Sequence, residues 1–146
     1  MSLVLCATRG GEGSIPTQEK AIDLAKEKGL TLAFLYVADS SFLNKTAAAV
    51  VIDVDEELMN MGEFLLTMAV ERAAEKGVKA ESVIRSGVIR DVLPEVSREL
   101  GATMIVLGRP AGESSRFQES EFEKFRDWLQ NETDATVVVH EEPMES

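Results

Sequence analysis

Residues 3–14 read LVLCATRGGEGS, and this stretch decides the fold. Leu3 to Ala7 form a short continuous apolar run, which is typical of a strand buried on both faces of a parallel sheet. A glycine-rich loop follows directly, and a segment with helical period comes after it. A buried strand, a loop and a helix in this order predict the first unit of an α/β fold.

The same alternation continues along the chain. Apolar runs predict further strands at about 31–37, 79–85, 103–107 and 136–140. Helices are predicted near 17–28, 53–77 and 91–100, and a last one begins after either Ser115 or Ser120. We therefore predict one α/β domain over residues 1–146, a doubly wound, five-stranded parallel sheet with helices on both faces.

Two of these helices have predicted starts that depend on local signals. Asp53 with Glu56 has capping-box spacing and predicts the start of the longest helix. Apolar residues at helical steps predict its packed face: Leu58, Met61, Leu65 and Met68. The methionines and phenylalanines of all the helices are expected in the core. In the next helix, Pro94 is expected in the first turn, where no amide bond is lost.

Composition describes a soluble globular protein and excludes several kinds of chemistry. The 146 residues are 45% hydrophobic and 28% charged, and no apolar run approaches the length of a membrane span. Cys6 is the only cysteine, so intrachain disulfides and thiolate zinc sites are excluded. The only histidine, His140, has no nearby metal-ligand or triad partner in the sequence. We expect a cytoplasmic protein without a metal site or a catalytic triad.

The charge balance is strongly acidic. The formal net charge is −11, from 26 acidic and 15 basic residues, which disfavours nucleic-acid binding. The acidic excess is largest in the C-terminal part of the chain, which ends in an acidic tail at about 141–146. Its charges alternate with apolar residues, so they are interpreted mainly as a solvated surface.

Two loops at the carboxyl ends of predicted strands are candidates for binding phosphate. Residues 8–14 (TRGGEGS) follow the first strand, and residues 108–115 (GRPAGESS) follow the fourth. Glycine allows backbone N–H groups to turn toward an anion, and the following helix adds its positive end. The candidate binding residues are Thr8, Arg9, Gly10, Gly11, Gly108, Arg109, Gly112, Ser114 and Ser115. Ordinary strand-to-helix turns are the alternative, because neither loop has a complete phosphate-binding motif.

The order of elements resembles a known family over essentially the whole chain. Residues 87–91 (GVIRD), residues 102–108 (ATMIVLG) and the valine-rich end at 136–139 are similar to universal stress proteins of the UspA-like type. That resemblance implies an adenine-nucleotide α-hydrolase-like fold with sheet order 3-2-1-4-5. It also implies ATP as the ligand, held between the loops after the first and fourth strands.

Three positions depart from the motif of the ATP-binding members. Thr8 stands where those members have Asp after the first strand, and Ala111 replaces the second glycine of their G-x2-G-x9-G-[ST] run. Glu121 and Phe122 occupy its final two positions, although Gly108 keeps the first glycine. A shifted arrangement, with residues 112–115 forming the phosphate nest, stays open. We expect a regulatory or interaction module without turnover and with a degenerate nucleotide site; the alternative is an ATP-binding switch with slow hydrolysis.

The last predicted strand is expected to form a homodimer. In the implied sheet order it lies at an edge, and it has no charge, proline or bulge within its valine run to protect that edge. The predicted contact residues are Thr136, Val137, Val138, Val139 and His140. A second copy would satisfy the free backbone groups, as is common in the family that this chain resembles. The acidic tail folding over the edge of a monomer is the alternative.

Overall fold

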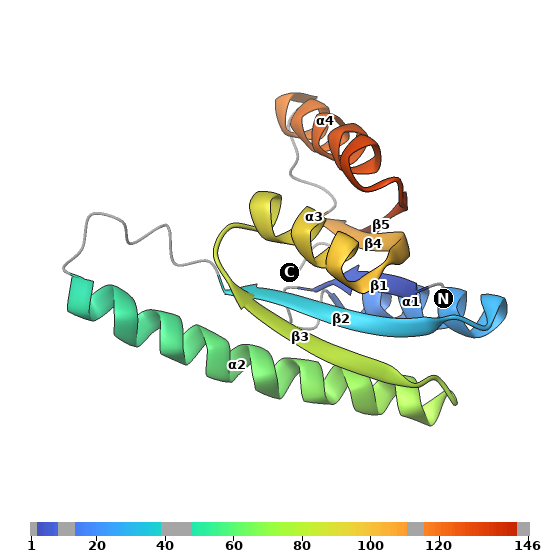
Figure 1. Ribbon diagram of the computed structural model, residues 1–146, viewed down its shortest axis with the longest axis horizontal. Helices are drawn as coiled ribbons and strands as arrows, with labels where there is room; N and C mark the ends of the chain where they lie inside the picture. Colours follow the sequence, from blue (N-terminus) through green and yellow to red (C-terminus); the bar gives the residue numbers. More distant parts are fainter. Residues whose placement is uncertain (1–2, 9–13, 39–47, 111–115, 143–146) are drawn as a thin grey trace.

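The computed structural model describes residues 3–8, 14–38, 48–110 and 116–142, with side chains described for all of these except 48–55, 109–110, 116–122 and 141–142. The strands are β1 (Leu3–Ala7), β2 (Thr31–Ala38), β3 (Ala80–Ser86), β4 (Ala102–Pro110) and β5 (Thr136–Glu142). The helices are α1 (Ile15–Lys28), α2 (Ala48–Glu75), α3 (Ile89–Leu100) and α4 (Arg116–Thr133). All strand pairs are parallel and the order is β3-β2-β1-β4-β5, which confirms the predicted fold (Figure 1).

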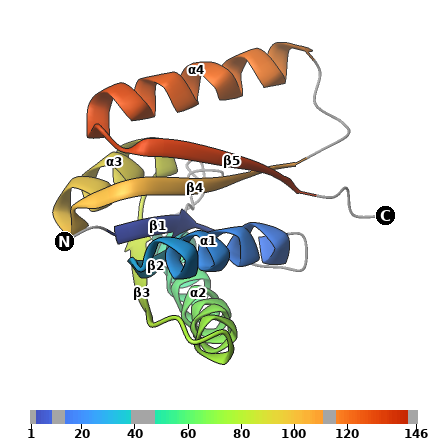
Figure 2. The same ribbon diagram turned by 90° about the vertical axis from the view of Figure 1, so that its right-hand side faces the viewer.

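The molecule has three layers, with α1 and α2 on one face of the sheet and α3 and α4 on the other (Figure 2). Alternate side chains of each strand enter the two cores, because successive residues of a strand point to opposite faces. In β1, Val4 and Cys6 join the core under α1 and α2, whereas Leu3 and Leu5 join the core under α3 and α4. The central strand β1 is therefore apolar at every position.

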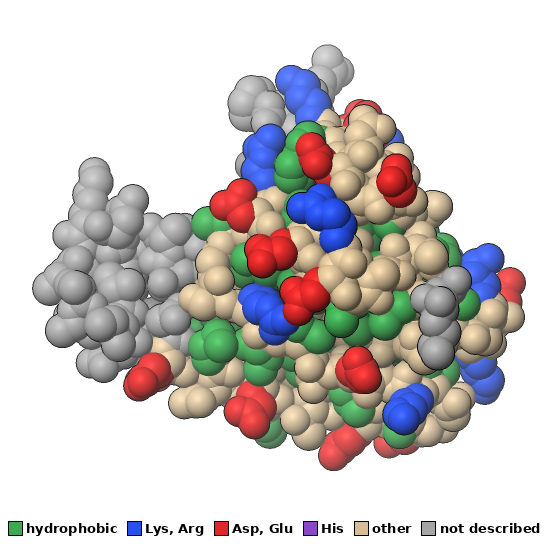
Figure 3. All heavy atoms as spheres, in the orientation of Figure 1, with side chains coloured by type: hydrophobic (Ala, Val, Ile, Leu, Met, Phe, Trp, Pro, Cys, Tyr) green, Lys and Arg blue, Asp and Glu red, His purple; other side chains and the backbone are tan. Residues whose placement is uncertain are grey.

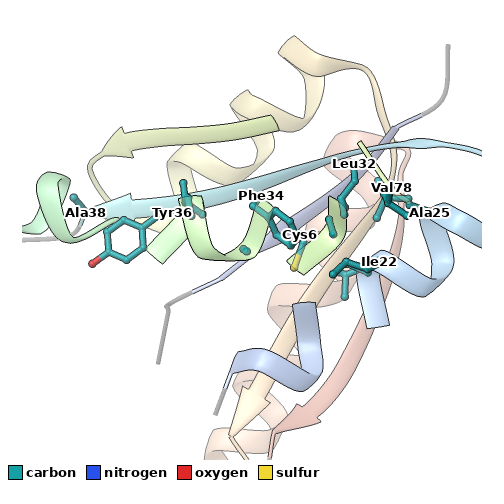
Figure 4. Close-up of a cluster of buried hydrophobic side chains, with 14 residues drawn as sticks. Cys6, Ile22, Ala25, Leu32, Phe34, Tyr36, Ala38 and Val78 are labelled. Carbon is teal, nitrogen blue, oxygen red and sulfur yellow. The ribbon is translucent and has the colours of Figure 1, made fainter. Parts of the chain in front are cut away.

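Helix α2 lies against the sheet through small residues. The buried residues of its inner face are Gly62, Leu66, Ala69 and Ala73. A Cβ atom on Gly62 would lie 2.4 Å from Cδ1 of Tyr36, so the missing side chain is what allows the Tyr36 ring to lie against the helix backbone. The ring sits beside Phe34 and Ala38, with its hydroxyl pointing away from the cluster (Figure 4).

This packing corrects the predicted core face of α2. Met61 is 53% exposed and Met68 is 41% exposed, so neither lies in the core, and Phe64 is 66% exposed. Leu58 and Leu65 are partly buried, as expected. The helix is apolar on more than one side, and the aromatic side chains of β2 leave room only for the side that carries glycine and alanine.

The predicted start of α2 was also wrong. The helix begins at Ala48, so Asp53 lies inside it and is not a cap. Ala48 and Ala49 are strong helix formers, and they extend the helix toward the N-terminus past the capping-box spacing. The segment between the predicted strand at 31–37 and the predicted helix at 53–77 is correspondingly shorter, and its residues 39–47 lie outside the described residues.

Helix α3 likewise begins earlier than predicted. Val88 is extended and its carbonyl oxygen accepts hydrogen bonds from the N–H groups of Asp91 and Val92, at 3.0 and 2.9 Å. Pro94 therefore lies past the first turn, contrary to the prediction, and leaves the carbonyl of Arg90 without its usual helical donor. The predicted C-terminal ends at residues 28 and 100 are confirmed, and the glycines that follow them, Gly29 and Gly101, adopt left-handed φ values of 66° and 69°.

Of the helices in the described part of the chain, none combines the length and hydrophobicity that crossing a bilayer requires.

Candidate functional site

The candidate site lies where the winding of the sheet reverses, at the carboxyl ends of β1 and β4. These two strands are neighbours, with Leu5 beside Ile105 and Cys6 beside Val106. The chain leaves β1 toward β2 on one side, whereas β4 leads to β5 on the other. Ligands of doubly wound sheets bind at such a switch point.

Thr8 is the predicted site residue that the structure describes most fully. It follows β1 directly and is 5% exposed. Its N–H donates to the carbonyl oxygen of Leu35 at 2.9 Å, which fixes its backbone against β2. Its hydroxyl oxygen accepts a hydrogen bond from Nε2 of Gln18 at 3.0 Å. Thr8 is therefore built into the interior at the end of β1.

Gln18 links Thr8 to a positive charge on α2. The Gln18 side chain is 3% exposed, and its Oε1 accepts a hydrogen bond from Nη1 of Arg72 at 2.6 Å. A charge-assisted bond of this length is stronger than one between neutral groups. Thr8, Gln18 and Arg72 thus form a polar chain, hereafter the Thr8 chain, that joins β1, α1 and α2.

Sequence reasoning missed both Gln18 and Arg72. Gln18 carried a usable signal, because it lies one turn before Ala21 and Ile22 on the buried side of α1, where a polar side chain needs a partner. Arg72 carried none. It is 54 residues from Gln18, and only the packing of α2 against α1 brings the two together.

The second predicted loop begins later than expected. Gly108 and Arg109 belong to β4, where they lie beside His140 and Glu141 of β5, and the strand continues to Pro110. They were predicted as loop residues because glycine and proline usually end a strand, but pairing with β5 extends β4 past them. The sheet thus places Gly108 near the switch point as part of a strand.

The other predicted binding residues lie outside the described residues: Arg9, Gly10, Gly11, Gly112, Ser114 and Ser115. The same holds for the side chain of Glu121. Helix α4 begins at Arg116, so the start after Ser115 is the one observed.

The positive end of α1 follows the first of these loops directly in the sequence. Ser14, which is 2% exposed, precedes the helix, and the first turn of α1 has no acidic residue to offset the helix dipole. Within the described residues, no group of three His, Cys, Asp or Glu side chains could hold a metal ion. Cys6 is fully buried in the core, as predicted.

Comparison with known proteins decides the family. The model of the universal stress protein family matches residues 1–120, which is most of the chain. The chain belongs to the universal stress protein family. Universal stress protein YxiE of Bacillus subtilis (strain 168) is 29% identical over 113 residues, which are 72% of this chain and 76% of that protein.

Solved structures of this family have the same fold. A universal stress family protein from Burkholderia pseudomallei superimposes with a TM-score of 0.69 at 20% identity, over 94% of both chains. A universal stress protein in complex with cAMP gives a TM-score of 0.69 at 19% identity, over 95% of this chain and 96% of that one. The resemblance stated from the sequence is thus confirmed.

Proposed function

We propose that this universal stress family member is a regulatory module that acts by binding other molecules without turnover, and that its nucleotide site is degenerate. The observation that carries the proposal is the state of Thr8. It replaces the Asp of the ATP-binding pattern, and its hydroxyl oxygen accepts a hydrogen bond from Gln18 inside the protein. A neutral, buried acceptor in this environment offers less to a nucleotide than an accessible carboxylate does.

An ATP-binding switch with slow hydrolysis is the second candidate. It is supported by the solved relative in complex with cAMP, because cAMP and ATP share the adenosine group. The N-terminus of α1, whose first turn has no acidic residue, also suits a phosphate. The two candidates differ in the affinity for nucleotide that they predict.

Isothermal titration calorimetry of the full chain with ATP and with cAMP separates the candidates. We expect dissociation constants weaker than about 100 µM for both nucleotides. Thr8→Asp should strengthen ATP binding by about tenfold, because it restores a charged acceptor. Thr67→Asp adds the same charge at an exposed position of α2 and should leave the affinity unchanged.

The opposite result would favour the switch. Submicromolar ATP binding by the unchanged chain, lost in Gly108→Leu, would reject the degenerate site. A nucleotide released on denaturation and identified by mass spectrometry would do the same. Circular dichroism of each variant verifies that the fold is retained.

A homodimer through β5 belongs to the same proposal. β5 is an edge strand, as the sequence analysis expected. One donor of the strand is satisfied within the chain, because the N–H of Val137 donates to Oε1 of Gln130 on α4 at 3.1 Å. The valine run and its backbone groups suit pairing with a second copy.

A cytoplasmic location is also part of the proposal, since one buried cysteine needs no oxidising compartment.

Light scattering at tens of micromolar tests the dimer. We expect a dimeric mass, and a monomeric mass for Val138→Lys with the helical and sheet signals of circular dichroism retained. Asn131→Lys places the same charge at an exposed position of α4 and should stay dimeric. A monomeric mass for the unchanged chain would reject this interface.

A further inference from the structure

The outward face of α2 carries large apolar side chains that the core does not use. Met61, Phe64 and Met68 are 53%, 66% and 41% exposed, and their spacing of three and four residues places them along one side of the helix. Three such side chains within two turns form a contiguous apolar surface. Surfaces of this kind mark interaction sites more often than scattered exposed residues do.

These residues are the centre of a longer row. Residues 57, 61, 64, 68, 71 and 75 follow one another at alternating steps of four and three, which is the heptad spacing of a helix-pairing seam. The row, hereafter the α2 seam, consists of Glu57, Met61, Phe64, Met68, Glu71 and Glu75. Its centre is apolar and flexible, whereas both of its ends are acidic and exposed.

The exposed charged side chains described on α2 are all acidic. Glu56 and Glu63 are also exposed on the same helix, and acidic side chains gather over α2 along the lower margin of Figure 3. Arg72 is the basic residue of α2 and Lys76 directly follows the helix, and both have acceptors on α1. Arg72 donates to Gln18, and Nζ of Lys76 lies 3.7 Å from Asp23 and 3.9 Å from Glu19.

We propose that the α2 seam docks an amphipathic helix of a partner protein, one that is apolar at its centre and carries Lys or Arg at both ends of its seam. The apolar centre would bury Met61, Phe64 and Met68, and the basic ends would pair with Glu57 and Glu71. This surface is separate from the switch point, so the proposal does not depend on nucleotide.

A second copy of this chain does not fit the same surface. Parallel pairing of two α2 seams places Glu57 beside Glu57 and Glu71 beside Glu71, and antiparallel pairing places Glu57 near Glu71 and Glu75. Like charges at both ends oppose association in either orientation.

The probe for this proposal is a labelled synthetic helical peptide of about three heptads, with leucine at the central seam positions and lysine at the end positions. A matched peptide carries glutamate in place of each lysine. Fluorescence anisotropy with the full chain should show saturable binding of the lysine peptide and none of the glutamate peptide. Glu57→Lys with Glu71→Lys should reverse this preference.

Phe64→Ser separates docking on the seam from attraction by net charge, because it leaves every charge in place. We expect it to weaken binding of the lysine peptide by about tenfold or more. Met61→Ser should act in the same direction. Ile89→Ser, at a position of α3 that is 38% exposed, is the matched control and should change affinity by less than about twofold.

Three results would overturn the proposal. Equal affinity of the unchanged chain and Phe64→Ser for the lysine peptide would show attraction by charge alone. Equal binding of the two peptides would remove the role of the glutamates. A dimer that Phe64→Ser dissociates would show that a second copy covers the seam. All substituted residues are exposed, and circular dichroism checks that each variant is folded.

Discussion

At the scale of the residue, the notable feature is how deeply polar groups are built into the interior. Thr8 and Gln18 are both nearly inaccessible, and each depends on the other for a hydrogen bond. Ser97 is 1% exposed, and its hydroxyl makes no hydrogen bond within the described part of the chain. Buried polar groups stabilise a protein only when they are paired. Removing the Thr8 hydroxyl should therefore lower the free energy of unfolding, whereas removing the Ser97 hydroxyl should raise it.

Loss of the Thr8 hydroxyl should destabilise the protein. Thr8→Val leaves Nε2 of Gln18 buried without this acceptor, and we expect a loss of about 1–3 kcal/mol in the free energy of unfolding. Urea denaturation of Thr8→Val, Gln18→Leu and the double variant measures the coupling, since the double variant should lose less than the sum. Thr67→Val removes an exposed hydroxyl that donates a hydrogen bond to the carbonyl oxygen of Glu63. This control should lower the free energy of unfolding by at most about 0.5 kcal/mol. Additive losses at Thr8 and Gln18 would contradict the pairing.

Loss of the Ser97 hydroxyl should stabilise the protein. Ser97→Ala removes a buried, unpaired polar atom and introduces a better helix former, so the free energy of unfolding should rise by about 1 kcal/mol. Ser82→Ala removes an exposed hydroxyl from β3 and is the control, with little expected change. Chemical denaturation measures both. A destabilised Ser97→Ala would show that the hydroxyl has a partner in solution.

At the scale of the element, α2 shows that packing chooses which face of a helix becomes the core face. Glycine inside a helix costs stability compared with alanine, yet Gly62 lies near the middle of this 28-residue helix. Glycine is required at this position because the Tyr36 ring occupies the space that a side chain would need. The helix therefore lies close to β2, and Met61, Phe64 and Met68 remain exposed.

Gly62→Ala should destabilise the protein although alanine favours helix. The new methyl group would overlap the Tyr36 ring and force α2 away from β2, which should lower the free energy of unfolding by about 1–3 kcal/mol. In a Tyr36→Ala background the same change should be neutral or stabilising, because the ring is gone. Asn60→Ala, at an exposed position of α2, is the control for helix propensity, and its free energy of unfolding should rise slightly. Equal losses from Gly62→Ala in both backgrounds, measured by urea denaturation, would disprove the contact.

At the scale of the whole molecule, the two cores join the four helices to one sheet, so a change in one buried group should affect global unfolding. Tyr36 is the useful reporter, because it is the only tyrosine in the chain and belongs to the core under α2. Burial raises the pKa of the Tyr36 hydroxyl above its ordinary value of 10.0.

Stability should therefore fall at alkaline pH. A folded-state pKa above the unfolded-state value means that the folded protein holds this proton more tightly, so the stabilisation is complete below pH 10.0 and is lost as the pH rises through the folded-state pKa. The ultraviolet absorbance of tyrosinate should titrate at higher pH in the native protein than in urea-unfolded chain. In Tyr36→Phe, the free energy of unfolding should decline less steeply above pH 10.0. Coincident titration of native and unfolded chain would contradict the shift.

The sequence by itself determined the fold class, the five parallel strands and the positions of the helix ends at Gly29 and Gly101. These are local properties, because a continuous apolar run predicts a strand buried on both faces, and a glycine after a helix predicts a left-handed turn that ends it. The switch point and the position of Thr8 followed from the order of the elements. Boundaries were less well predicted, because pairing with β5 and strong helix formers extended β4 and α2 past their local stop signals.

Only the tertiary structure decided which groups meet. The Thr8 chain joins residues 10 and 54 positions apart, and Tyr36 faces Gly62 through the packing of α2 on β2. Periodicity could show that α2 is apolar, but it could not show that Met61 and Phe64 point outward. The physical reason is that a helix with several apolar sides is placed by the shape of the surface it packs against. That surface exists only after the sheet has formed.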